Sequence, residues 1–141
     1  MLILNENKVF VDHVDDQMVA LMIDTGSYYT FNALSSAILN DLGAGYSPEA
    51  VSETLCGKFG NRFKQEETDT FIRELLEAEL LEETEGRGRE ADSEMECAKV
   101  RTEDGFELGM EKYDDVASYF MIDPIHEVNP QMGWPYAKEQ E

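Results

Sequence analysis

The hydrophobic pattern of this chain changes its period once, at Asn32, and that change constrains the fold more than any other feature. Before it, apolar residues rich in β-branched and aromatic types form three short runs, at residues 9–14, 18–23 and 27–31. Asp-Asp and Asp-Thr-Gly sequences, which favour turns, follow the first and second runs. Three short strands joined by tight turns predict an antiparallel meander, with the most apolar run as its middle strand.

After Asn32 the spacing becomes helical. Asn32 is a good N-cap, and apolar residues follow it at intervals of four until a glycine-rich stop at residues 43–45. Ser47 and Pro48 are residue types that begin a helix, and Gly60-Asn61 ends this second helix. A third helix is predicted from about residue 65 to residue 82, with one apolar face formed by Phe71, Ile72, Leu75, Leu76 and Leu80.

This order of elements predicts an α+β domain with a winged-helix-like arrangement. A three-stranded antiparallel sheet is followed by a three-helix bundle, because three strands cannot bury their apolar face without helices packed on it. The domain is predicted to span residues 1–83.

Two further segments follow the domain. Residues 84–104 begin with a charged, glycine-containing stretch and are predicted to form an acidic flexible linker. Residues 105–141 are richer in apolar types and are expected to be a docking tail that packs on the domain, a second copy or a partner. Within this tail, residues 111–121 are predicted to form a short helix that Pro124 ends.

Charge excludes several classes of function. The 141 residues include 31 acidic and 11 basic side chains, for a net charge of −20. Such a surface repels phosphate backbones and anionic membranes, so neither nucleic acid nor membrane is an expected partner. No apolar run is long enough for a membrane span and no secretory signal is recognised. Two isolated cysteines, Cys56 and Cys97, indicate a reduced, cytoplasmic protein.

No combination of residues indicates catalysis. The chain has no glycine-rich phosphate loop and no GxSxG, HExxH or CxxC motif, so we expect no enzyme activity and no cofactor. Asp123, His126 and Glu127 invite a metal-site interpretation, but Pro124 breaks regular geometry and no second ligand cluster exists, so no metal is expected.

The ordered succession of motifs resembles the PqqD-like family over about residues 7–83. The resemblance is carried by an apolar strand, an Asp-Thr-Gly turn, a tyrosine-rich strand ending in Phe31-Asn32, a helix starting at Ser47, a Phe59-Gly60 break and a long helix closing on Leu80-Leu81. The sequences at 123–128 and 133–135 are similar to a tail found on some longer members.

The resemblance implies a RiPP recognition element. Such a domain is a non-catalytic chaperone or adaptor that holds the leader of a ribosomally made precursor peptide and presents the peptide to a modifying enzyme. The leader would add as a strand to an open sheet edge at 27–31. Peptide-binding residues are then expected on that strand (Tyr28, Tyr29, Thr30 and Phe31) and on the third helix (Asp69, Ile72, Arg73 and Leu76).

Other functions remain open at this point. The chain could be a structural or assembly subunit whose tail docks on a partner or a sister chain, and pairing of two strand edges would make a homodimer. A winged-helix DNA regulator is disfavoured by the acidic third helix. Residues 111–136 could also be a modified substrate attached to their own binding domain. The identity of the peptide, the enzyme and the product is not encoded in these patterns.

Overall fold

The computed structural model describes residues 1–15, 17–103 and 105–114. The motifs at 123–128 and 133–135, the metal-site candidates and most of the predicted tail helix therefore lie outside the described residues. In the described part of the chain, no helix is long and apolar enough to cross a membrane.

The predicted meander is present. Strands β2 (Val9–Val14), β3 (Gln17–Met22) and β4 (Tyr28–Phe31) pair antiparallel, with β3 in the middle. The second turn closes with two backbone hydrogen bonds: the Met22 amide donates to the Ser27 carbonyl, and the Gly26 amide donates to Met22. Gly26 has φ = 78°, a conformation that glycine adopts without strain.

The three predicted helices follow. They are α1 (Ala33–Gly43), α2 (Pro48–Phe59) and α3 (Gln65–Glu77). Asn32 caps α1 by accepting a hydrogen bond from the Ser35 amide, and Ser47 caps α2 by accepting one from the Ala50 amide. Both caps satisfy amides that a helix leaves without an internal partner. The α+β class predicted from the sequence is confirmed.

The third helix ends five residues earlier than the sequence predicts. Glu79 adopts a left-handed conformation (φ 66°), and the Leu80 amide turns back to the Leu75 carbonyl at 3.0 Å, as in a Schellman cap. Residues Leu81–Glu83 then form strand β5, which pairs antiparallel with β1 (Leu2–Leu4). The sequence prediction missed both strands because neither a glycine nor a proline marks the end of the helix.

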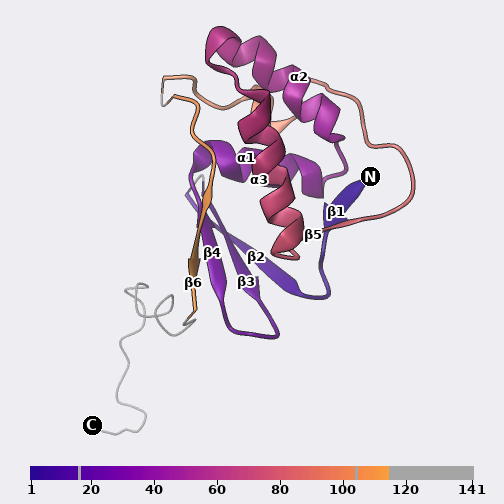
Figure 1. The fold of residues 1–141 in the computed structure, drawn as a ribbon, viewed down its shortest axis with the longest axis vertical. Helices are drawn as coiled ribbons and strands as arrows, with labels where there is room; N and C mark the ends of the chain where they lie inside the picture. The colour runs from indigo at the N-terminus through magenta and orange to yellow at the C-terminus, as the bar shows by residue number, and fades with distance from the viewer. Residues whose placement is uncertain (16, 104, 115–141) are drawn as a thin grey trace, which may run out of the picture.

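One core joins the sheet and the helices. Helix α1 packs against β3 and β4, while α3 packs against α2 and β5. Figure 1 shows α3 lying in front of the other helices, with the β1–β5 pair on one side and the larger sheet below. Ile38, Leu42, Val51, Leu55 and Leu75 are fully buried at the centre of this arrangement.

Residues 84–103, which the sequence predicts to be part of a flexible linker, instead pack on the domain. Met95 and Cys97 of this segment are fully buried against the core. The Asp41 carboxylate, itself 1% exposed, accepts hydrogen bonds from the Glu96 and Cys97 amides, each at 2.8 Å. We call this stretch, residues 84–103, the wrapping segment. Composition did not reveal it, because Met95 and Cys97 are its only fully buried apolar side chains and Asp41, which binds its backbone, lies far away in the sequence.

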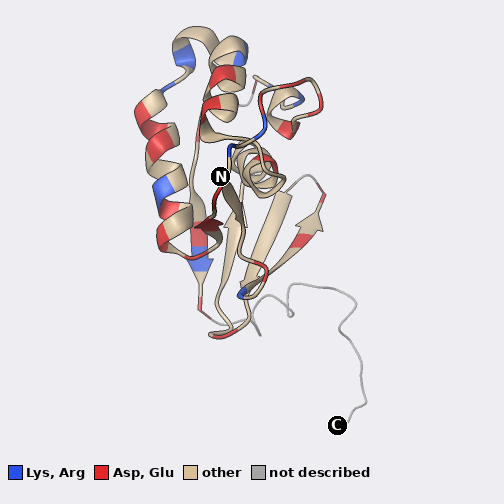
Figure 2. Ribbon diagram, turned by 90° about the vertical axis from the view of Figure 1, so that its right-hand side faces the viewer, with Lys and Arg blue, Asp and Glu red and all other residues tan. Residues whose placement is uncertain are grey.

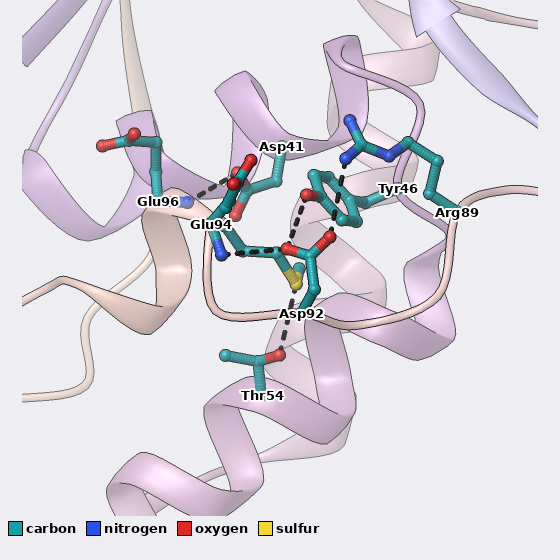
Figure 3. A network of polar contacts seen from close by, with 8 residues as sticks. Asp41, Tyr46, Thr54, Arg89, Asp92, Glu94 and Glu96 are labelled. Atoms are coloured by element: carbon teal, nitrogen blue, oxygen red, sulfur yellow. Dashed lines mark hydrogen bonds and ion pairs between the residues drawn. The ribbon is translucent and has the colours of Figure 1, made fainter.

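A second contact group fixes the wrapping segment at its start (Figure 3). Arg89 lies over the Tyr46 ring, with 4.1 Å between the guanidinium carbon and the ring centroid. The Tyr46 hydroxyl donates to Asp92 at 2.7 Å. This hydrogen bond raises the pKa of Tyr46 and lowers the pKa of Asp92, because it stabilises the neutral phenol and the charged carboxylate together. Below it, the Thr54 hydroxyl donates to the Met95 sulfur.

Candidate functional site

The outer edge of β4 is covered by another part of the same chain. Strand β6 (Met110–Tyr113) pairs antiparallel with β4, so the sheet has the order β2-β3-β4-β6. The register places Tyr28 opposite Tyr113 and Thr30 opposite Glu111. The expectation of an open edge at 27–31 is therefore wrong for this structure. The predicted helix at 111–121 is also wrong over residues 111–113, which are part of the strand.

Backbone alternation shows which groups of β4 meet β6. Both polar groups of a strand residue point to one side, and those of the next residue point to the other. The Ser27 carbonyl accepts from Met22 of β3. By alternation, the amides and carbonyls of Tyr28 and Thr30 point toward β6, whereas those of Tyr29 point toward β3. Tyr28 and Thr30 therefore supply the backbone groups that receive the added strand.

The side chains of β4 divide between two faces of the sheet. Tyr29 and Phe31 belong to the buried core, and the Phe31 ring contacts Phe71 of α3 edge-on with centroids 6.3 Å apart. Tyr28 and Thr30 are on the opposite face. There the Tyr28 ring stacks on Tyr113 of β6, with centroids 4.9 Å apart and planes 14° from parallel. Tyr28 thus contacts the added strand through both its backbone and its ring.

The residues just before β6 are held by the start of α1 and the end of α2. The Asn32 side-chain amide donates to the Glu107 carbonyl at 3.1 Å, and the Gly109 amide donates to the buried Ser35 hydroxyl at 3.0 Å. Phe106 lies edge-on to Phe59, the last residue of α2, and to Phe63, four residues beyond it, with 5.2 and 5.6 Å between the ring centroids. The segment from Phe106 to Tyr113 is therefore bound along its length; we call it the docked strand.

Two of the four predicted residues of α3 line a different site, and the other two are exposed on the helix. Ile72 and Leu76 line a cavity of about 600 Å³ together with the start of α2, the first two residues of the chain and residues 86–88. Asp69 and Arg73 are exposed, and each has a neighbour within α3: Gln65 donates to Asp69, and Arg73 donates to Thr70. Acidic side chains are spread along this helix (Figure 2).

The structure thus brings the four strand residues to one edge but places Ile72 and Leu76 at another site. Ile72 and Leu76 face the first residues of the chain, β5 and the start of α2, which cover that flank of α3. The sequence analysis anticipated α2 but neither β1 nor β5. The sequence analysis also missed the docked strand. Its signal was available, since Phe106, Leu108 and Met110 alternate with other residues at the period of a strand.

The polar side chains at the site could act as metal ligands or as titrating groups. Among residues 1–15, 17–103 and 105–114, no group of three histidine, cysteine or acidic side chains is arranged to hold a metal ion. The hydroxyl of Tyr113 donates to Glu111 at 2.9 Å, and this hydrogen bond raises the pKa of the tyrosine. The edge is therefore built from backbone groups, aromatic rings and apolar side chains, which are suited to hold an extended peptide.

Two comparisons with known proteins gave a match. Residues 17–81, a little less than half of the 141-residue chain, match the model of the family described as coenzyme PQQ synthesis protein D (PqqD). A solved structure titled "TbiB1 in Complex with the TbiA(beta) Leader Peptide" is 28% identical and is similar over 57% of this chain and 95% of that chain, with a TM-score of 0.48. Comparison with curated proteins gave no match. Residues 17–81, which run from β3 through α3 to the first residue of β5, are a domain of the PqqD-like family.

Proposed function

We propose that this protein is a precursor-peptide-binding chaperone. It binds the leader of a ribosomally made peptide in extended form at the outer edge of β4, and it presents the peptide to a separate modifying enzyme. In this proposal the chain itself performs no reaction and needs no cofactor.

One observation carries the proposal: in a PqqD-like domain, the β4 edge accepts an antiparallel strand from outside the matched region. Main-chain hydrogen bonds from Tyr28 and Thr30 supply affinity for any extended peptide. Stacking on the Tyr28 ring and contacts with the Phe59 and Phe63 rings add preference for aromatic residues at defined positions.

The charge distribution supports a peptide over a nucleic acid as the partner. The net charge of −20 and the acidic residues along α3 oppose entry of a recognition helix into a DNA groove. Arg73 is exposed on α3 and offers a positive charge to an acidic leader residue. We retain Asp69, Ile72 and Leu76 as candidates for a contact with the peptide beyond the strand itself.

The test is calorimetric binding of the full chain to precursor peptides encoded beside its gene. Thr30→Pro removes the amide that points toward the added strand, whereas Thr30→Val removes only the hydroxyl and keeps that amide. We expect one peptide to bind the natural chain and Thr30→Val with similar affinity, and to bind Thr30→Pro at least tenfold more weakly. Equal binding of all three chains would contradict the assignment of the edge. Absence of binding to every candidate precursor would contradict the function.

A further inference from the structure

We propose that the docked strand, residues 106–113, is a built-in ligand of the peptide edge, which a precursor peptide must displace in order to bind. This inference rests on the proposed function and adds two things to it. It makes binding a competition between two segments, and it specifies the side-chain pattern that a competing peptide needs.

The backbone groups of β4 that a leader would need are already directed at β6. Tyr28 and Thr30 point their amides and carbonyls toward β6, and the register places them opposite Tyr113 and Glu111. An incoming strand at this edge needs those same groups. Because each backbone amide and carbonyl on this side is already directed at β6, a leader and the docked strand cannot both pair with β4.

The side chains of the docked strand also contact the domain, on both faces of the sheet. On the outer face Tyr113 stacks on Tyr28. On the opposite face Leu108 and Met110 pack against the core, and Phe106 fits against the rings of Phe59 and Phe63. The docked strand therefore presents apolar residues at its first, third and fifth positions and an aromatic residue at its eighth.

This pattern defines the partner chemically. A peptide that replaces the docked strand needs an aromatic residue for the Phe59–Phe63 contact, two apolar residues at alternate positions after it, and an aromatic ring three residues further on to stack on Tyr28. A polar peptide without these residues would gain only the main-chain hydrogen bonds and would not displace the strand.

Tethering makes the competition strong. The wrapping segment is fixed at Cys97 by the buried Asp41 carboxylate, and the chain is held again at Thr102, whose carbonyl accepts from Arg62, four residues before the docked strand begins. The docked strand is thus delivered close to β4. Short tethers give effective concentrations on the order of 1 mM, so a free peptide at micromolar concentration competes at a disadvantage of at least tenfold.

A synthetic peptide that copies residues 105–114 is the probe, because it tests the edge without knowledge of the natural precursor. Glu111→Pro in the full chain removes an amide that points toward Thr30 and should release the docked strand. Lys112→Pro is the matched control, since alternation directs the Lys112 amide away from β4. Glu111→Ala removes the same side chain as the proline variant but keeps the amide.

We expect the probe to bind Glu111→Pro at least tenfold more tightly than it binds the natural chain, Lys112→Pro or Glu111→Ala. Hydrogen exchange at the Tyr28 and Thr30 amides should be faster in Glu111→Pro alone and should slow again when the probe is added. A second probe carrying the same proline should not bind.

The other outcomes overturn the proposal. Equal binding of the probe to all four chains would mean that the docked strand does not compete for the edge. Unchanged exchange at Tyr28 and Thr30 in Glu111→Pro would mean that β6 does not protect them. If released β4 fails to bind the probe, the edge is not a peptide site for this pattern. Binding of the probe with no binding of any precursor would keep the built-in ligand and reject the proposed function.

Discussion

Asp41 is the residue through which the wrapping segment is most strongly held, and Asp41→Asn is the sharpest test of that role. Both carboxylate oxygens are used: Oδ1 accepts from the Glu96 amide and Oδ2 from the Cys97 amide, each at 2.8 Å (Figure 3 shows the first of these contacts). Asparagine has nearly the same size but one acceptor oxygen. The variant therefore directs an NH₂ group toward one of the two buried amides.

The magnitude follows from the type of hydrogen bond. A hydrogen bond to a charged group contributes about 1.5–3 kcal/mol, and a buried donor left without a partner costs about 1–3 kcal/mol. The variant weakens one of the two bonds by removing the charge and eliminates the other. We expect the free energy of opening of the segment around Cys97 to fall by about 2–4 kcal/mol, which corresponds to roughly a 30- to 900-fold increase in the open population.

Thiol labelling measures this opening directly. Cys97 is fully buried, and its burial together with the nearby Asp41 carboxylate raises the pKa of its thiol, so it reacts only after the segment opens. Cys56 is exposed and would dominate the signal. All chains therefore carry Cys56→Ser, so that the rate of reaction with an aromatic disulfide reports Cys97 alone.

The expected result is a labelling rate for Asp41→Asn that is at least 30-fold above that of the Cys56→Ser parent. Asn40→Ala, a half-buried position one residue earlier on α1, serves as the control and should change the rate by less than threefold. A rate for Asp41→Asn within threefold of the parent would refute the reasoning, because the carboxylate would then not hold the segment.

Two further predictions concern the same surface. A Cβ added to Gly88 would lie 2.6 Å from the Ser47 Cα, so Gly88→Ala should lower the free energy of unfolding by about 1–3 kcal/mol in denaturant titrations. In the control variant Gly57→Ala, the new Cβ meets nothing within 4 Å in the middle of α2, and the free energy of unfolding should rise by about 0.5–1 kcal/mol. Equal effects of the two substitutions would be inconsistent with the close approach at Gly88. The Tyr46–Asp92 hydrogen bond should contribute its full stability between the ordinary pKa of aspartate, 3.8, and that of tyrosine, 10.0. Because the pKa of Asp92 is lowered, the contribution is lost as the pH falls below 3.8; because the pKa of Tyr46 is raised, it is lost as the pH rises above 10.0. The stability difference between the natural chain and Tyr46→Phe, measured from below pH 3.8 to above pH 10.0, should be constant in the middle of this range and fall at both ends. A difference that stays the same at both extremes of pH would rule out this linkage.

Local sequence signals determined most of the domain core. The strands at 9–14 and 28–31 and the caps at Asn32 and Ser47 occur where their residue types predict them. These features depend on residues a few positions apart, so periodicity and capping chemistry are sufficient to identify them. The ordered succession of these elements also carried the resemblance to the PqqD-like family, which the match over residues 17–81 bears out.

Contacts between distant residues were decided only in the tertiary structure. The end of α3 at Glu77 depends on a left-handed Glu79 and on the pairing of β5 with β1, which lies some eighty residues earlier in the chain. The wrapping segment is held by Asp41, whose partners are two backbone amides. Every residue type except proline has a backbone amide, so the sequence gives no sign of this contact. The domain boundaries near residues 83 and 104 stay a prediction.

The candidate site shows the same division. The sequence by itself determined that residues 27–31 form a strand at the border of a meander, because alternation and turn residues are local properties. Whether that edge strand is unpaired depends on residues Met110–Tyr113, far later in the chain, which form a strand by pairing with β4. The backbone hydrogen bonds of a strand are made to a neighbouring strand, so the tertiary structure determines which strand is the partner. Here the partner of β4 at this edge is the chain's own docked strand.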